Sequence, residues 1–148
     1  MSDEAIRFKI QEIIQRVPGC GIVHEYGRWC SDWSKFILLF QDSISKKILG
    51  WEITRQAAPG TYISNCEEQV NHSYIIRGFM GLQDADRTDI KFNALIELIR
   101  AEFRKDFTLG GLNELPHGFD VRVIDERSFG TVLCHHCEIV IPVQEVQS

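Results

Sequence analysis

The residues most capable of chemistry are Cys134, His135, His136 and Cys137, which are consecutive near the C-terminus. A C-x-x-C pair binds zinc when it lies in a tight turn, because the two sulfur atoms then converge on one ion. Here the flanking residues are mostly Val, Leu and Ile, which favour a strand, and residues three apart in a strand point to opposite faces. We therefore expect two buried thiols without a metal, a hydrogen-bonded His135 on the apolar face, and an exposed His136 beside Glu138.

Three further cysteines, Cys20, Cys30 and Cys66, are candidate nucleophiles. A reactive thiol needs a neighbouring base and partial exposure. His24 or His72 could supply the base after folding, but no spacing pairs either of them with a cysteine. Neither the P-loop pattern nor the dinucleotide fingerprint occurs. The sequence thus predicts a protein that is not an enzyme and has no cofactor, with a small thiol- or metal-dependent enzyme as an alternative.

Length and composition favour one soluble domain. A chain of 148 residues is long enough to bury its own core. The formal net charge of −5 disfavours non-specific nucleic-acid binding, which requires clustered Lys and Arg. The charged N-terminus predicts no signal peptide, and no apolar run approaches the ~18 residues of a membrane span. Five cysteines, an odd number, then indicate reduced thiols in a cytosol.

Two helices are predicted from apolar residues at helical spacing. The first covers residues 3–17, and its apolar stripe consists of Ile6, Ile10, Ile13, Ile14 and Val17. The second begins after a cap at Asp84 or Asp86 and ends before Gly110-Gly111. Its inward stripe consists of Phe92, Leu95, Ile96, Ile99 and Phe103.

Strands are predicted from alternation and β-branched residues. They cover residues 22–26, 47–55, 70–82, 119–125 and 131–143, with a turn at 126–130 and a bulge or bend near Gly78 and Gly81. The last strand places Leu133 on the same face as Ile139, Ile141 and Val143.

The sequence does not decide between two structures for residues 36–40. They form either a buried strand or the end of a helix that begins at Ser31 and has Trp33, Phe36, Ile37 and Phe40 inward. In both cases the fold class is α+β: a single domain over residues 1–148, with one mostly antiparallel sheet of four or five strands and two main helices packed on one face.

A long loop or arm is predicted at about residues 56–69, because Ala57-Ala58-Pro59-Gly60 interrupts regular structure. Tyr62 and Ile63 stand within this polar segment. They either dock on a neighbouring subunit or fold back on their own core. An open sheet also leaves two edge strands, which a closed ring of identical subunits would cover.

Several short motifs carry a resemblance to a known family. They are Trp33-Ser34-Lys35-Phe36, the G-W-x-I-x-R strand from Gly50 to Arg55, the G-L-x-D-A segment from Gly81 to Ala85, and F-G-x-V-L-C-H from Phe129 to His135. In this order, and over Ile6 to Glu145, the chain resembles the tail-terminator, tail-completion and neck proteins of long-tailed bacteriophages.

The resemblance implies a non-enzymatic structural protein of the virion tail or neck, assembled in the host cytoplasm. Such proteins form rings, usually hexamers, that cap the tail tube, stop its polymerisation and contact the head connector. Genomic DNA would pass through the lumen without specific binding, and no membrane is involved. The candidate contacts to a neighbour or the tube are Tyr62, Ile63, Asp42, Lys46, Lys47, Asp84 and Asp86. The alternatives are another head–tail connector or tail-tube component, and a monomeric or dimeric binding module with an apolar pocket.

Overall fold

The computed structural model describes residues 2–28, 30, 32–106, 108–113 and 118–148. Its elements in chain order are α1 (Ser2–Gln15), β1 (Ile22–His24), α2 (Trp33–Leu38), β2 (Leu49–Ala57), β3 (Gly60–Tyr62), β4 (Glu68–Gly81), the 3₁₀ helix η1 (Asp84–Asp86), α3 (Thr88–Lys105), β5 (Asp120–Phe129) and β6 (Val132–Gln147). The predicted α+β class is confirmed. None of the described helices is long and apolar enough to cross a membrane.

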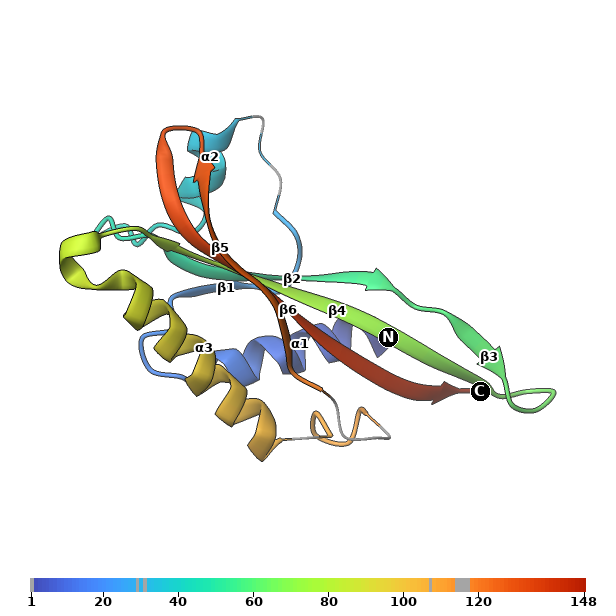
Figure 1. Cartoon of the computed structure of the whole chain (residues 1–148). Helices are drawn as coiled ribbons and strands as arrows, with labels where there is room; N and C mark the ends of the chain where they lie inside the picture. Colours follow the sequence, from blue (N-terminus) through green and yellow to red (C-terminus); the bar gives the residue numbers. More distant parts are fainter. Residues whose placement is uncertain (1, 29, 31, 107, 114–117) are drawn as a thin grey trace.

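The strands form one open sheet in the order β1-β2-β4-β6-β5, and β3 pairs separately with β4. Only β1 and β2 run parallel, so the sheet is mostly antiparallel as predicted. The long strands β4 and β6 pair over their whole common length and form its spine (Figure 1). The sheet has six strands instead of the predicted four or five, because β3 arises from the segment predicted as a loop.

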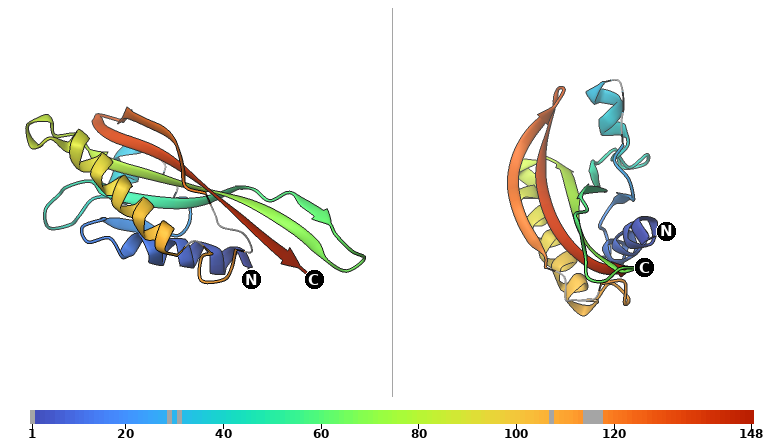
Figure 2. Two further views of the ribbon diagram at one scale, coloured as in Figure 1. Left: turned by 60° about the horizontal axis from the view of Figure 1, so that its bottom comes forward. Right: turned by 90° about the vertical axis from the view of Figure 1, so that its right-hand side faces the viewer.

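Helices α1 and α3 cover one face of the sheet, as Figure 2 shows from two sides. Their apolar stripes were predicted correctly, because helical spacing is a local property that tertiary packing then uses. The α1 stripe is buried throughout, and in α3 Leu95 alone of the predicted stripe is only partly buried. Opposite them lie inward residues of the three central strands: Trp51, Ile53, Tyr74, Ile76, Cys137, Ile139, Ile141 and Val143.

Helix α2 packs on the other face and resolves the open alternative for residues 36–40. Asp32 caps it by accepting a hydrogen bond from the Lys35 N–H at 2.9 Å. Phe36, Ile37 and Phe40 are buried against Phe79, Phe129 and Cys134. The predicted inward position of Trp33 was wrong: this side chain is 54% exposed at the helix start, although its ring contacts Phe36 and Phe129. The predicted helix start, Ser31, lies outside the described residues.

Gly78 does not mark the predicted bulge. It pairs with Trp51 on one side and with Cys137 on the other in unbroken register. A Cβ at this position would lie 2.3 Å from Cζ3 of Trp51, so the indole ring occupies the space that a side chain would need. The glycine therefore serves close side-chain packing instead of a change in strand direction.

The predicted turn at residues 126–130 was wrong, because β5 continues to Phe129 and the chain turns at Gly130. The polar composition of this stretch is typical of a loop. However, β5 is an edge strand, and exposed charges on an edge strand discourage pairing with another chain. The last predicted strand, 131–143, is present as β6, which includes Pro142 as predicted and continues to Gln147. Pro142 can lie there because β5 pairs only as far as Val140, and beyond it the Asn113 side chain bonds to the Pro142 carbonyl and the Gln144 N–H.

Candidate functional site

The predicted loop or arm at residues 56–69 is an arm built of strand. It comprises the end of β2, β3 and the start of β4, and β4 pairs there with the end of β6. It extends beyond the helices at the right of Figure 1. Pro59 lacks an N–H, yet its carbonyl accepts the Asn71 N–H at 2.9 Å, so the hydrogen bonding continues past the proline. The predicted interruption at Ala57-Ala58-Pro59-Gly60 is thus present but short: β2 ends at Ala57 and β3 begins at Gly60.

The arm tip exposes two apolar side chains. Tyr62 is 73% and Ile63 is 53% exposed, so neither folds back on the core of its own chain. The tip has a defined backbone, because the N–H groups of Ile63 and Ser64 donate to the Glu67 carbonyl at 3.0 and 3.4 Å. Exposed apolar side chains on a hydrogen-bonded protrusion are typical of a protein contact surface.

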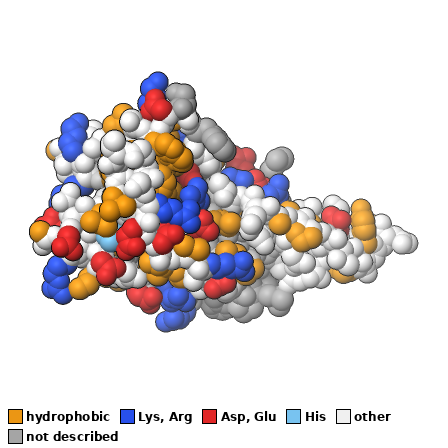
Figure 3. All heavy atoms as spheres, turned by 45° about the horizontal axis from the view of Figure 1, so that its top comes forward, with side chains coloured by type: hydrophobic (Ala, Val, Ile, Leu, Met, Phe, Trp, Pro, Cys, Tyr) orange, Lys and Arg blue, Asp and Glu red, His pale blue; other side chains and the backbone are white. Residues whose placement is uncertain are grey.

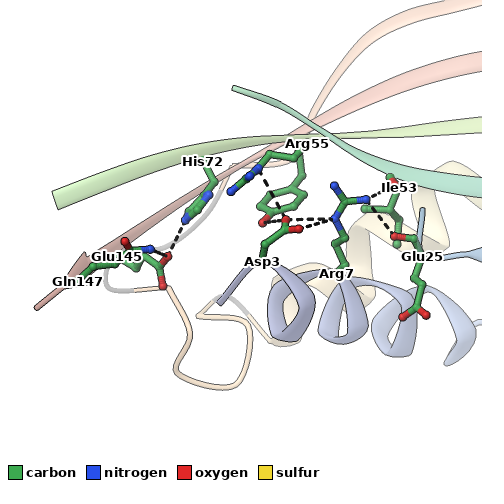
Figure 4. Close-up of polar contacts among 9 residues, drawn as sticks. Asp3, Arg7, Glu25, Ile53, Arg55, His72, Glu145 and Gln147 are labelled. Carbon is green, nitrogen blue, oxygen red and sulfur yellow. Dashed lines mark hydrogen bonds and ion pairs between the residues drawn. The ribbon is translucent and has the colours of Figure 1, made fainter. Parts of the chain in front are cut away.

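Polar contacts fasten the base of the arm to α1 (Figure 4). The Tyr74 hydroxyl donates to Asp3 at 2.7 Å, and Arg7 Nε donates to the same carboxylate at 3.1 Å. Burial acts to raise the pKa of Asp3, but these hydrogen bonds outweigh it and hold the pKa below its usual value. Arg7 also donates to the carbonyls of Glu25 and Ile53 at 3.3 and 3.2 Å. Helix and sheet are thus joined where the arm begins.

A second fastening joins the two long strands within the arm. The buried His72 ring on β4 lies with Nε2 2.6 Å from Glu145 Oε1 on β6, and Gln147 donates to the same oxygen at 2.7 Å (Figure 4). Together with the β3–β4 ladder, this contact gives the arm a fixed direction relative to the body.

The other end of β4 opens into a groove of about 580 Å³. We call it the groove; its lining residues include Lys46 and Lys47 from the 42–47 turn, and Gln83 and Asp86 from the η1 region. Two predicted contact segments that are far apart in the sequence therefore lie together. The predicted arm contacts, Tyr62 and Ile63, lie at the opposite end of the sheet. The predicted residues thus belong to two separate surfaces, except Asp42 and Asp84, which do not line the groove.

The 42–47 turn is held by its own backbone. Asp42 Oδ1 accepts the N–H groups of Ile44 and Ser45 at 2.7 and 3.2 Å, and these bonds lower the pKa of Asp42. Lys46 adopts a left-handed conformation with φ of 61°. Asp42 therefore shapes the turn, and the prediction did not name Ile44, an apolar side chain that is 93% exposed at its tip.

Neither Asp84 nor Asp86 caps α3, contrary to the prediction. Both belong to η1 and are exposed, and the residue before α3 is Arg87, in a left-handed conformation with φ of 58°. The Thr88 hydroxyl accepts the Gln83 N–H at 3.0 Å and so closes the η1 turn. Because η1 takes up the two acidic residues, Arg87 instead occupies the position before α3.

The groove has an apolar floor and a basic rim. Leu133, expected to point into the core, is 44% exposed and lines the groove together with Leu82. Lys91, assigned only to the solvent side of α3, stands on the rim with Lys46 and Lys47. The helical pattern correctly placed Lys91 outside the core, but only the fold brings the three lysines together.

The Cys134-His135-His136-Cys137 segment is strand, and its two thiols lie in different apolar clusters on opposite faces, as predicted. Burial raises the pKa of Cys134 to about 11 and that of Cys137 to about 12, which keeps both thiols protonated at neutral pH. His135 is the predicted core histidine: its Nε2 lies 2.9 Å from the Thr88 hydroxyl. No group of three or more potential metal ligands was found within the described ranges.

The predicted exposure of His136 was wrong. It is fully buried, and its Nδ1 lies 2.9 Å from Asp125 Oδ1. Burial lowers the pKa of His136, and the Asp125 hydrogen bond only partly opposes this. Beside it on the same face, Arg77 lies 3.6 Å from the buried carboxylate of Glu52. Strand alternation placed His136 on the correct face but gave no sign that Asp125 of β5 and the Arg77 and Phe79 side chains of β4 would enclose it.

A second hollow, of about 460 Å³, lies on this α2 face and is lined by Arg28, Cys30, Trp33, Glu52 and Arg77 among others. No predicted contact residue borders it. Its guanidinium groups are accompanied by the carboxylates of Asp32 and Glu52, so its charges nearly balance.

No protein-family model matches this chain, and no curated protein matches it either. The arm and the groove are therefore the features of the molecule that bear on its function.

Proposed function

We propose that the chain is a structural protein of a long-tailed bacteriophage, a tail terminator that forms a homo-oligomeric ring, a hexamer by its resemblance. The ring caps the tail tube, stops its polymerisation and supplies the surface for the head connector. The sequence motifs from Trp33 to His135 support the family, and the structure adds a geometry suited to assembly.

The observation that carries the proposal is the pair of unlike surfaces at opposite ends of one sheet. A contact between unlike surfaces is heterologous, so each copy offers both halves, and the repeated contact closes into a ring when the rotation permits. The exposed Tyr62 and Ile63 on a fixed arm provide one such surface. A ring of this kind works by shape and contact alone and requires no catalytic group.

The charge of the chain supports passage of DNA through a ring. Its net charge of −5 leaves no general attraction for phosphates, so DNA in the lumen would not be retained. We infer from the resemblance that the protein acts in the virion tail or neck after assembly in the host cytoplasm.

The test is the oligomeric state of the purified protein, measured by light scattering over a concentration series with electron microscopy of the same fractions. We expect closed rings, and addition of the rings to polymerising tail-tube protein should shorten the tubes. Unlimited tubes of this chain alone would instead identify a tail-tube component. A monomer at every concentration that leaves tube length unchanged would contradict the proposal.

A further inference from the structure

We propose that the arm tip of one copy docks in the groove of a second copy, with Tyr62 and Ile63 on the apolar floor and Glu67 and Glu68 against the lysine rim. This inference rests on the proposed ring and deepens it by naming the two halves of the contact.

The arm tip is acidic without internal compensation. Between Arg55 and Arg77 the chain contains no Lys or Arg, and its only charged side chains are Glu67 and Glu68. The space-filling view shows the arm, at the right, with few charged side chains compared with the body (Figure 3). A partner for this tip should therefore combine apolar surface with positive charge.

The groove has that combination. Its rim carries Lys46, Lys47 and Lys91 against one carboxylate, that of Asp86. Its floor includes Ile48, Leu49, Met80, Leu82, Val132 and Leu133. The volume of about 580 Å³ lies within the range of roughly 300–1,000 Å³ typical of pockets that hold a bound group. The α2-face hollow has no such excess of positive charge, which is why we assign the arm to the groove.

The arm cannot reach the groove of its own chain. β4 begins at the arm with Glu68 and ends at the groove with Gly81, and its 14 residues span roughly 45 Å. In Figure 1 the arm tip and the 42–47 turn lie at opposite sides of the molecule. The contact must therefore be made between copies. It leaves the copy that supplies the arm with an unused groove and the other copy with an unused arm, as a head-to-tail ring requires.

The first experiment uses cysteine cross-linking in the full-length protein. Cys66 is exposed at the arm tip, Cys30 is exposed at the α2-face hollow, and the remaining three cysteines are buried. A Ser45→Cys variant places a thiol on the groove rim. With a short bismaleimide we expect intermolecular cross-links between positions 45 and 66, and their loss when Cys66→Ser is added.

The cross-links separate this inference from the proposed ring. Closed rings without the 45–66 cross-link, or with a 30–66 cross-link instead, would overturn the docking contact and leave the ring intact. Open filaments with the 45–66 cross-link would support the contact and contradict the terminator function. A strictly monomeric protein that gives no cross-links and leaves tube length unchanged would overturn both.

A charge exchange tests the rim independently. Glu67→Lys and Lys47→Glu should each weaken assembly roughly tenfold, and the double variant should recover most of the loss. Lys105→Glu, a change of the same charge on the exposed end of α3, is the matched control and should leave assembly unchanged. Failure of the double variant to recover, with both single variants folded, would overturn the contact between these residues.

Discussion

The two ends of β4 are built from the same strand but differ in what covers them. Toward Gly81 the strand lies between β2 and β6, with α1 and α3 on one face and α2 on the other. Toward Glu68 it pairs with β3 and β6 beyond the helices, and the tip exposes Tyr62 and Ile63. Buried apolar area is the main source of stability. The difference therefore indicates that the covered end stabilises the fold, while the arm is available for contacts with another molecule.

The largest expected effect is a core truncation at the covered end. The Phe92 ring lies stacked between Trp51 and His135, each with its centroid 5.8 Å away. Phe92→Ala should lower the free energy of unfolding by about 3–5 kcal/mol, because it removes a buried ring and leaves a cavity. Urea unfolding followed by tryptophan fluorescence measures this. Phe8→Ala, at an exposed phenylalanine on α1, provides the control. Equal losses of unfolding free energy in the two variants would show that the covered end does not stabilise the fold more than an exposed position does.

A smaller loss is expected at Gly78. The Cβ of a Gly78→Ala variant would lie 2.3 Å from the Trp51 ring and 2.9 Å from Cys137 Sγ, so the core must shift. We expect a destabilisation of about 1–3 kcal/mol. Gly81→Ala is the matched control on the same strand, since its Cβ meets Ile48 at an ordinary 3.5 Å. If Gly78→Ala left the free energy of unfolding unchanged in the same assay, the spine of the sheet would be loosely packed.

A weaker, pH-dependent effect is expected from His136. Its pKa is lowered in the folded protein from 6.5, so between the folded pKa and 6.5 the unfolded chain binds more protons. Stability should therefore fall as the pH decreases through about 6.5 toward the folded pKa, and His136→Gln should flatten the curve.

The control for this effect is Asp125→Asn, which removes the acceptor that partly holds up the His136 pKa. This variant should steepen the decline above about pH 5, where carboxyl groups contribute little. Identical slopes in the wild type and both variants would show that His136 does not link protonation to folding.

The smallest effect on stability is expected at the arm tip. Tyr62→Asp should change the free energy of unfolding by less than about 0.5 kcal/mol, because the side chain is exposed. The same variant should lose ring formation, as measured by light scattering. Tyr26→Asp, at another exposed tyrosine away from the arm, should also change the free energy of unfolding by less than about 0.5 kcal/mol, and it should leave ring formation intact. A Tyr62→Asp variant that is strongly destabilised would place the tip within the folding core and remove the contrast between the two ends.

Amphipathic helices α1 and α3 could be predicted from the sequence because their apolar residues recur every three or four positions, a pattern that the chain carries locally. Alternation likewise placed the two thiols of Cys134 and Cys137 on opposite faces of a strand. Tyr62 and Lys47, both predicted contact residues, are exposed. Their exposure could be predicted because polar neighbours and turn residues mark surface segments without reference to the rest of the fold.

Relations between distant segments were decided only by tertiary structure. Burial of His136 depends on side chains of β4 and β5, the need for glycine at position 78 depends on Trp51, and β3 exists because β4 offers it an edge. The grouping of Lys46 and Lys47 with Lys91, and their separation from the arm, follow from the length and direction of β4. Sequence spacing determines which face of its own element a residue occupies. Pairing and packing between elements determine what that face meets, because those contacts join residues that are far apart in the chain.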